Sequence, residues 1–236
     1  MKRKVKKMKL LTFNVQHFRN YITREIDIDL FARTIKEINP DIICLNEVFG
    51  EGSNDTYGDQ VKKIADKLNL NYFFGKAISI PKGNYGNAIL SKYPIENQEI
   101  IPIPDPLVRN EDTYYETRIL IKAKINNIYV FITHMGLAKD ERINATKVLE
   151  KNINNLTEPF VIMGDFNMTP NDSLLKPIYK YTIDVLEEKD GNTFPSVNPE
   201  RRIDYILVSK NIKKYNGKII EKVVSDHLPI ESNLEF

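Results

Sequence analysis

The sequence of 236 residues contains no tryptophan and a single cysteine. Because Cys44 has no partner in the chain and lies within the apolar run Ile42-Ile43-Cys44-Leu45, we exclude an internal disulfide bond and expect a buried thiol. No apolar run approaches the ~20 residues that a helix needs to cross a bilayer. The basic start of the chain is followed by neither an apolar signal-peptide core nor a cleavage site. These absences predict a soluble protein of a reducing compartment, and we expect it in the cytoplasm.

The body of the chain also lacks a surplus of positive charge. The formal net charge is +2, but the first nine residues alone contribute six positive charges, so the remainder carries 2 − 6 = −4. Proteins that bind long nucleic acids without regard to sequence derive most of their affinity from basic side chains that neutralise phosphates. The acidic body argues against that class. We interpret residues 1–8 as a basic tail and residues 9–236 as one domain, since this length can bury one large core.

Apolar runs typical of strands alternate with segments of helical period. Helices are predicted at 23–38, 59–68 and 142–156. Strands are predicted at 9–15, 41–45, 71–80, 87–91, 96–103, 116–125, 128–133, 160–163, 182–185, 202–208, 218–223 and 228–234. Several of these strands follow one another as hairpins, which does not fit a purely parallel βαβ series. The pattern predicts an α/β fold in which two mixed sheets pack face to face with helices outside.

Polar residues lie at the ends of the predicted strands, where loops at one edge of a sandwich can gather distant segments. They are Asn14, Asn46, Glu47, His134, Asp165, Asn167, Asp204, Asp226 and His227. Carboxylates hold hard divalent cations, amides and imidazoles hold phosphate oxygens, and an imidazole beside a carboxylate can move a proton. The set therefore predicts metal-assisted chemistry on a phosphate.

Each of these residues also has a structural interpretation. Asp165 and Asn167 could form only an Asx turn after a strand. His134 and His227 could be hydrogen-bonded core histidines, and Glu47 an exposed acid. Taken singly, these alternatives are at least as probable as function, but their joint occurrence in one order along the chain is improbable.

Seven short motifs in the chain occur in an order that resembles a known family. They are Phe13-Asn14-Val15, Pro40-Asp41-Ile42-Ile43-Cys44-Leu45-Asn46-Glu47-Val48, Gly86-Asn87-Ala88-Ile89-Leu90-Ser91, Thr133-His134, Gly164-Asp165-Phe166-Asn167, Arg202-Ile203-Asp204-Tyr205-Ile206 and Ser225-Asp226-His227-Leu228-Pro229. Together they resemble the endonuclease/exonuclease/phosphatase superfamily, which has the deoxyribonuclease-I-like fold. The resemblance implies a four-layer α/β/β/α sandwich and makes residues 9–236 a single catalytic domain. Asn46 departs from the pattern, since Gln is usual at this position.

The resemblance further implies hydrolysis of a phosphoester that depends on Mg²⁺ or Mn²⁺. Glu47 is expected to bind the metal, with Asn14 positioning the water or phosphate beside it. Asp226 is expected to support the same ion or to bind a second one. The residues for which a catalytic role is implied are Asp165, His227, His134, Asn167, Asp204 and Asn14.

The family pattern assigns a role to each of these catalytic candidates. Asp165 occupies the position of the residue that orients and deprotonates the attacking water, and Asn167 the position that donates to the phosphate. His227 is expected to contact a non-bridging oxygen or to transfer a proton, with Asp204 fixing its tautomer. His134 is expected to stabilise charge developing near the phosphate. The sequence leaves open which of Asp165 and His227 is the general base.

Three further residues are candidates for contact with the substrate. Arg118, on the strand before His134, could reach the same phosphate. Asn87 matches a family motif, although an Asn after Gly is also an ordinary turn residue. His17 follows the first strand, where a loop role is as reasonable as a substrate contact.

The substrate is the least determined part of this interpretation, because relatives with nearly the same core cleave DNA, inositol phosphates, sphingomyelin and protein-linked nucleotides. Here the loops are short, and the loop at 105–115 carries mixed charge with Tyr114 and Tyr115. We therefore expect a phosphodiesterase or phosphatase of a small or lipid-derived phosphoester. The alternatives are an endonuclease or DNA-repair exonuclease of the same chemistry, and a non-catalytic binding module that kept the fold.

Overall fold

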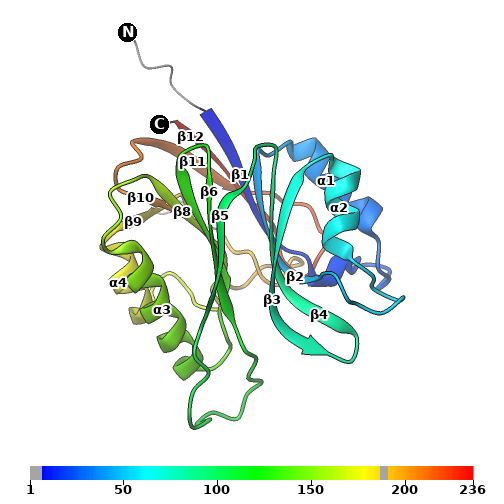
Figure 1. Cartoon of the computed structure of the whole chain (residues 1–236), viewed down its shortest axis with the longest axis horizontal. Helices are drawn as coiled ribbons and strands as arrows, with labels where there is room; N and C mark the ends of the chain where they lie inside the picture. Colours follow the sequence, from blue (N-terminus) through cyan, green and yellow to red (C-terminus); the bar gives the residue numbers. More distant parts are fainter. Residues whose placement is uncertain (1–6, 187–190, 236) are drawn as a thin grey trace.

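The first of two β-sheets in the computed structural model, which describes residues 7–186 and 191–235, has six strands. In spatial order they are β11 (Lys214–Ile219), β12 (Ile230–Glu235), β1 (Lys7–Asn14), β2 (Ile42–Phe49), β4 (Gly83–Ser91) and β3 (Asn71–Ile80). Only β1 and β2 run parallel within this sheet. The outer face is covered by α1 (Ile28–Ile38) and α2 (Gln60–Leu68), as Figure 1 shows.

The second sheet packs against the first and also has six strands. Their spatial order is β5 (Glu96–Pro102), β6 (Ile119–Ile125), β7 (Ile128–His134), β8 (Phe160–Asp165), β10 (Asp204–Ser209) and β9 (Thr182–Asp184). Here β7 and β8 form the parallel pair. The helices α3 (Lys139–Ile153) and α4 (Lys176–Tyr179) lie on the outer face. Two short 3₁₀ turns, Gln16–Phe18 and Ser173–Leu175, complete the described elements.

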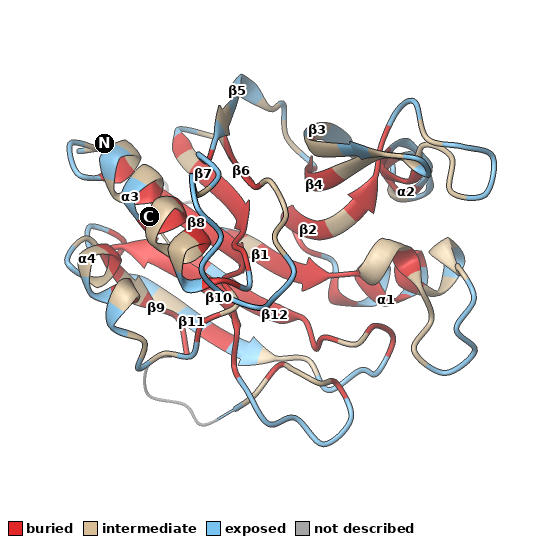
Figure 2. Cartoon of the chain, turned by 90° about the horizontal axis from the view of Figure 1, so that it is seen from below, coloured by how far each residue is buried: buried red, intermediate tan, exposed pale blue. Residues whose placement is uncertain are grey.

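The buried side chains form three apolar layers, which run as red bands through the strands and helix faces in Figure 2. Cys44 and Ile132 belong to the layer between the sheets, Phe31 and Ile64 to the layer under α1 and α2, and Leu149 to the layer under α3 and α4. Three apolar layers require four layers of secondary structure around them. The predicted four-layer α/β/β/α sandwich is confirmed, and the Cys44 thiol is buried as expected.

Two helices begin at other residues than the apolar period predicts. Helix α1 begins at Ile28 rather than at 23, because the Asp27 side chain accepts a hydrogen bond from the backbone of the first turn. Residues before it form a turn that the Asn20 side chain holds through two backbone N–H groups. Helix α3 begins at Lys139 rather than at 142, where the Glu141 side chain accepts from the backbone just before the helix.

Strand boundaries differ most from prediction where the apolar pattern is weakest. The edge strand β11 covers Lys214–Ile219 instead of 218–223, and most of its residues are exposed or half-buried. Strand β2 continues past the predicted end at 45 to Phe49. Strand β1 already includes Lys7 and the buried Met8, whereas residues 1–6 of the predicted tail lie outside the described residues. Among the described helices, none combines the length and the apolarity that a membrane crossing requires.

Candidate active site

Strand register places three of the predicted residues side by side at one end of the second sheet. His134 pairs with Asp165 across β7 and β8, and Asp204 pairs with Asp165 across β8 and β10. Gly164 makes this close spacing possible. Its φ is +144°, and a Cβ at this position would lie 1.9 Å from the carbonyl oxygen of Thr133. The row His134, Asp165, Asp204 therefore follows from the pairing of three adjacent strands.

A β-bulge in the first sheet directs Glu47 toward this row. Asn46 pairs with Asn87 and Val48 pairs with Gly86, so Glu47 is the extra residue between them. Its φ of +62° is unfavourable for a residue with a side chain, at a cost of about 1–3 kcal/mol. Bulges of this kind re-aim side chains next to active sites. Glu47 thus lies inside β2 rather than after its end, which corrects the predicted boundary.

The side chain of Asn46 joins the two sheets behind the site. Its Nδ2 donates to Asn87 Oδ1 at 2.8 Å in its own sheet and to the Thr133 carbonyl oxygen at 3.0 Å in the other. Its Oδ1 accepts from the backbone N–H of Asp165 at 3.0 Å. All three bonds are buried. Asn46 therefore fixes the distance between the sheets at the end where the predicted residues gather.

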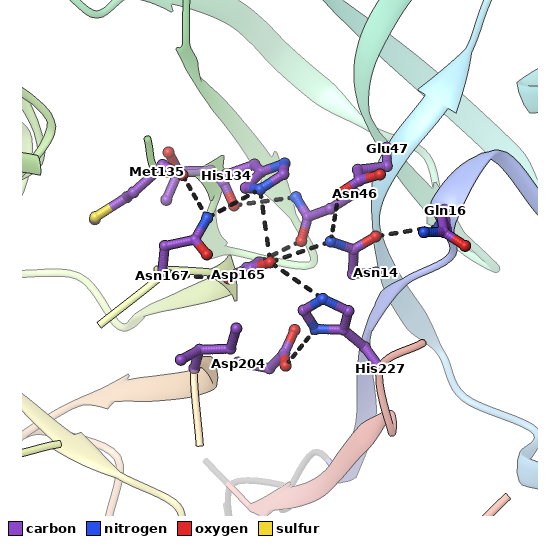
Figure 3. Close-up of polar contacts among 12 residues, drawn as sticks. Asn14, Gln16, Asn46, Glu47, His134, Met135, Asp165, Asn167, Asp204 and His227 are labelled. Atoms are coloured by element: carbon purple, nitrogen blue, oxygen red, sulfur yellow. Dashed lines mark hydrogen bonds and ion pairs between the residues drawn. The ribbon is translucent and has the colours of Figure 1, made fainter. Parts of the chain in front are cut away.

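The carboxylate of Asp165 is the centre of the cluster (Figure 3). Its Oδ2 accepts from Asn14 Nδ2 at 3.1 Å, and its Oδ1 accepts from the backbone N–H of Asn167 at 2.9 Å. The same Oδ2 lies 3.5 Å from His134 Nε2 and 3.7 Å from His227 Nε2. Both sheets and four segments of the chain thus meet at one oxygen atom.

Burial is the main influence on the protonation of Asp165. Together with the nearby charge of Asp204, it raises the pKa of the Asp165 carboxyl to about 7, although His227 acts in the opposite direction. A carboxylate with this pKa can accept a proton near neutral pH.

His227 is held by a carboxylate on its other nitrogen. Its Nδ1 lies 2.9 Å from Asp204 Oδ2, and both side chains are buried. Burial alone would lower the pKa of this imidazole, but the charges of Asp204 and Asp165 outweigh it and raise the pKa to about 10. The ring of Phe194 packs against the imidazole with a centroid distance of 4.7 Å. His227 is therefore a buried imidazolium that presents Nε2–H toward Asp165.

His134 has a cation next to its Nδ1, where His227 has the carboxylate of Asp204. Arg118 Nη1 lies 3.1 Å from His134 Nδ1, and because a guanidinium only donates, Nδ1 must accept and Nε2 carries the proton. The Asn167 amide nitrogen lies 3.3 Å from Nε2, but with the proton on Nε2 both atoms are donors and form no hydrogen bond with each other. The Asn167 amide donates to the Met135 carbonyl oxygen at 2.9 Å. Burial and the charges of Arg118 and His227 lower the pKa of His134 well below its usual value.

A cavity of about 330 Å³ opens onto this cluster. The predicted residues that line it are Glu47, Arg118, His134, Asp165, Asn167, Asp226 and His227. Asn14 and Asp204 lie behind this lining, almost fully buried, and contact it through their hydrogen bonds. The structure thus brings these nine predicted residues into one site.

Two predicted substrate contacts lie elsewhere. Asn87 is buried behind the site and accepts a hydrogen bond from Asn46. His17 is half-buried, with its ring 5.6 Å from the ring of Tyr57 and 6.1 Å from that of Phe49. Neither residue belongs to the cavity lining. The geometry gives Asn87 a structural contact and leaves a role for His17 with the substrate as a prediction.

Five lining residues were not singled out by the sequence. They are Tyr85, Glu116, Leu137, Phe194 and Arg201. Tyr85 lies in β4 near the bulge of the first sheet. Glu116 lies just before β6, in a segment predicted as part of that strand, and the other three come from loops. Glu116 precedes Arg118 by two residues, which was the one local indication in the sequence that it lies close to the site.

Two of the lining carboxylates have the environment of cation ligands. Glu47 Oε1 accepts from Asn14 Nδ2 and its Oε2 from the hydroxyl of Tyr85, both at 2.9 Å. Asp226 Oδ2 accepts from Gln16 Nε2 at 2.8 Å. These donors are neutral, and within the described residues no basic side chain forms an ion pair with either acid. Oxygen ligands with unbalanced negative charge fit a hard divalent cation.

A second group of possible ligands is more compact. Asp165, Asp204 and His227 each offer one ligand atom, and these atoms lie within 4.8 Å of one another. The hydrogen bond between Asp204 and His227 already uses two of the groups. We therefore regard Glu47 and Asp226 as the better fit for a cation, and the compact group as a proton-handling cluster.

The four-layer fold and the cluster of carboxylates and histidines at one end of its sheets agree with the comparison with known proteins. The sequence profile of the Endonuclease/Exonuclease/phosphatase family matches residues 11–227. The chain belongs to this family, whose members are generally hydrolases that use divalent metals.

Individual relatives are similar over almost the whole chain. Uncharacterized protein YbhP of Escherichia coli K12 is 26% identical over 251 residues, which cover 97% of this chain and 96% of that protein. The endonuclease/exonuclease/phosphatase from Beutenbergia cavernae has a TM-score of 0.78 at 18% identity, covering 98% of this chain and 72% of that one. Mannosyl-6-phosphatase Bt3783 of Bacteroides thetaiotaomicron has a TM-score of 0.75 at 18% identity, covering 97% and 100%. At these identities the structural likeness shows the fold.

Proposed function

We propose that this protein is a divalent-cation-dependent phosphoric ester hydrolase of a small substrate. The observation that carries the proposal is the convergence on Asp165 Oδ2 of Asn14, His134 and His227, next to the carboxylates of Glu47 and Asp226. A base, two hydrogen-bond donors and a candidate cation site in one cavity are the parts that phosphoester hydrolysis needs.

In this proposal Asp165 is the general base. Its two oxygens are oriented by Asn14 and by the backbone of Asn167, which leaves an acceptor toward the cavity. A pKa of about 7 suits the removal of a proton from water near neutral pH. The pKa of His227 is too high for a base at that pH, because two carboxylates hold the imidazole in its protonated form.

The two histidines then donate hydrogen bonds to the phosphate. His227 presents Nε2–H of an imidazolium, and His134 presents Nε2–H of a neutral ring. Preorganised donors of this kind stabilise charge that develops in the transition state. Asn167, which also lines the cavity near His134, adds an amide to the same surface.

Glu47 and Asp226 are the residues that we propose to hold the cation. A bound divalent cation supplies charge neutralisation on the phosphoryl oxygens and lowers the pKa of its bound water. The hydrogen bonds from Asn14 and Tyr85 orient the Glu47 carboxylate for this role, and Gln16 orients Asp226.

The size of the cavity and the net charge of the chain favour a small substrate. The cavity of about 330 Å³ lies at the lower end of the usual range for ligand sites, which is about 300–1,000 Å³. The net charge of −4 outside the first nine residues disfavours the alternative of a nuclease that grips long DNA. The shared fold of a mannosyl-6-phosphatase agrees with a small phosphate ester. The complete set of candidate catalytic groups argues against a non-catalytic binding module.

Hydrolysis assays with two substrates test the proposal. Bis-(p-nitrophenyl) phosphate and plasmid DNA are incubated with Mg²⁺, with Mn²⁺ or with a chelator, using wild type and Asp165→Ala. We expect turnover of the aryl ester with either metal, little cleavage of DNA, and loss of activity with chelator. Asp66→Ala, on the exposed face of α2, is the matched control and should behave as wild type. Turnover that resists the chelator, or an active Asp165→Ala, would contradict the proposal.

A further inference from the structure

A further carboxylate, Glu116, lines the cavity without a part in the proposed reaction. Its side chain is 11% exposed, and its Oε1 lies 2.7 Å from Nη1 of Arg118. Its backbone N–H donates to Glu141 Oε1 at the start of α3, at 3.0 Å. The residue is therefore held from two directions before any substrate binds.

The second oxygen of Glu116 is largely unused. Oε2 receives a long hydrogen bond of 3.4 Å from the hydroxyl of Tyr114, and among the described residues no other donor reaches it. The adjacent Arg118 keeps a buried donor, Nε, without a hydrogen-bond partner. Because Nε is buried, it does not face the cavity, and the available group is the acceptor Oε2 of Glu116. A hydroxyl group can donate a hydrogen bond to this acceptor.

The charges around the cavity decide which kind of group can bind there. Glu47, Asp226 and Glu116 line it together with Arg118 and Arg201. A second anionic group placed at Glu116 would meet the negative charge of its carboxylate. A cationic group would lie beside the guanidinium of Arg118, whose charge already balances Glu116. A neutral hydroxyl avoids both repulsions.

Aromatic side chains suit the carbon skeleton of such a group. Tyr85, Tyr114 and Phe194 all contribute to the lining. Their rings contribute apolar surface on which a carbon skeleton can pack. At about 330 Å³ the cavity accommodates a phosphoryl group with one small alcohol, and the second aryl group of the diester in the assay above would extend out of the open cavity.

We infer that Glu116 recognises hydroxyl groups on the alcohol part of the substrate, and that the substrate is a phosphate monoester of a small polyhydroxylated alcohol such as a sugar. This inference rests on the proposed function. Glu116 acts here as a specificity residue, and the ion pair with Arg118 holds its carboxylate in place.

The test compares esters with and without hydroxyl groups. A panel of hexose, pentose and glycerol phosphates is assayed beside cyclohexylmethyl phosphate, which has a six-membered ring and the same phosphate linkage but no hydroxyls. For wild type, kcat/KM of the best polyol ester should exceed that of cyclohexylmethyl phosphate by at least about 10-fold to 100-fold, as expected for hydrogen bonds to a charged group.

The variant Glu116→Gln then measures the contribution of the carboxylate. Any disturbance of Arg118 and His134 in this variant lowers kcat/KM of the polyol ester and of cyclohexylmethyl phosphate alike, so it does not change their ratio. The ratio of their kcat/KM values should fall by about 10-fold or more, mainly through KM of the polyol ester. Glu96→Gln, on the exposed edge strand β5, should leave the ratio unchanged.

The outcomes separate this inference from the proposed function. A wild-type ratio near one, or a ratio that Glu116→Gln does not change, overturns the inference. So does turnover of the aryl diester without turnover of any polyol ester, which leaves the proposed function intact. If no phosphoester at all is hydrolysed with Mg²⁺ or Mn²⁺, the proposed function fails together with the inference.

Discussion

The two histidines of the site face the same carboxylate oxygen from opposite neighbourhoods. Both Nε2 atoms approach Asp165 Oδ2, at 3.5 Å for His134 and 3.7 Å for His227. Behind His134 lies the guanidinium of Arg118, and behind His227 lies the carboxylate of Asp204. The partner on Nδ1 decides the protonation of each ring, so one residue type supplies a neutral donor and a cationic donor within one site.

The difference in protonation between the two histidines also supports the choice of Asp165 as the general base of the proposed reaction. With His227 held as an imidazolium and His134 held in its neutral form with Nδ1 occupied, neither ring offers a free lone pair toward the cavity near neutral pH. Asp165, which lies between them, is the remaining acceptor. Four variants break or sharpen the comparison, and they follow in order of expected effect.

Asp165→Asn removes the acceptor that the two histidines share and has the largest expected effect. We expect kcat to fall by about 10³-fold to 10⁴-fold, because the amide cannot take a proton from water.

The same variant has an expected effect on stability. In the folded wild type the pKa of Asp165 is about 7, which is higher than the ordinary value of 3.8. At pH values above the ordinary pKa, the charged carboxylate of Asp165 therefore destabilises the fold. The free energy of unfolding of the variant should therefore exceed that of wild type by about 1–3 kcal/mol at pH 8, and the difference should vanish toward pH 4. Thermal and urea unfolding at both pH values measure it, and a less stable variant at pH 8 would contradict the account.

Asp204→Asn tests the carboxylate behind His227. Without this charge, burial is opposed by fewer carboxylates and the pKa of His227 falls below its wild-type value of about 10. Activity should drop by about 10²-fold to 10³-fold at pH 8, because the ring is then neutral. The alkaline limb of kcat/KM against pH should move to lower pH. An unshifted alkaline limb would show that the charge of His227 does not matter for turnover.

His134→Asn removes the neutral donor. We expect kcat to fall by about 10²-fold, the usual effect of losing one preorganised donor to a developing charge. Because His134 is neutral over the working range, the positions of both pH limbs should stay as in wild type. A shift of either limb in this variant would mean that His134 titrates during turnover.

Arg118→Met removes the cation behind His134 and has the smallest expected effect, a loss of about 10-fold in kcat/KM. The guanidinium is one cause of the lowered pKa of His134, so this pKa should rise in the variant. Without the guanidinium, the neutral ring can also carry its proton on Nδ1, and a ring in that tautomer presents no Nε2–H toward the cavity. Lys151→Met, on the exposed face of α3, is the matched control. A variant with the wild-type kcat/KM would disprove the role of Arg118 in fixing the tautomer.

The sequence was sufficient to predict the sheets and the residues that follow regular strands. Asp165, His134 and Asp204 lie beside one another because of strand register, and apolar runs mark those strands. The start of α1 was placed five residues too early, because the period continues into a turn while Asp27 sets the first helical residue.

The rest of the site depends on contacts between distant residues. The pairing of Asn46 with the backbone of Asp165 spans 119 positions, and no local pattern marks it. The bulge that turns Glu47 arises from how β2 pairs with β4. Phe194 and Arg201 reach the cavity from loops without periodicity, so only the folded chain shows them.

The most direct test of the account is the protonation state of the two histidines. Nitrogen-15 NMR of the imidazole rings at pH 7, assigned with His134→Asn and His227→Gln, reports which nitrogens carry protons. We predict that both nitrogens of His227 are protonated, and that His134 carries a proton on Nε2 alone. Equal states for the two rings, or a neutral His227, would contradict the claim that Arg118 and Asp204 set opposite charges on either side of Asp165.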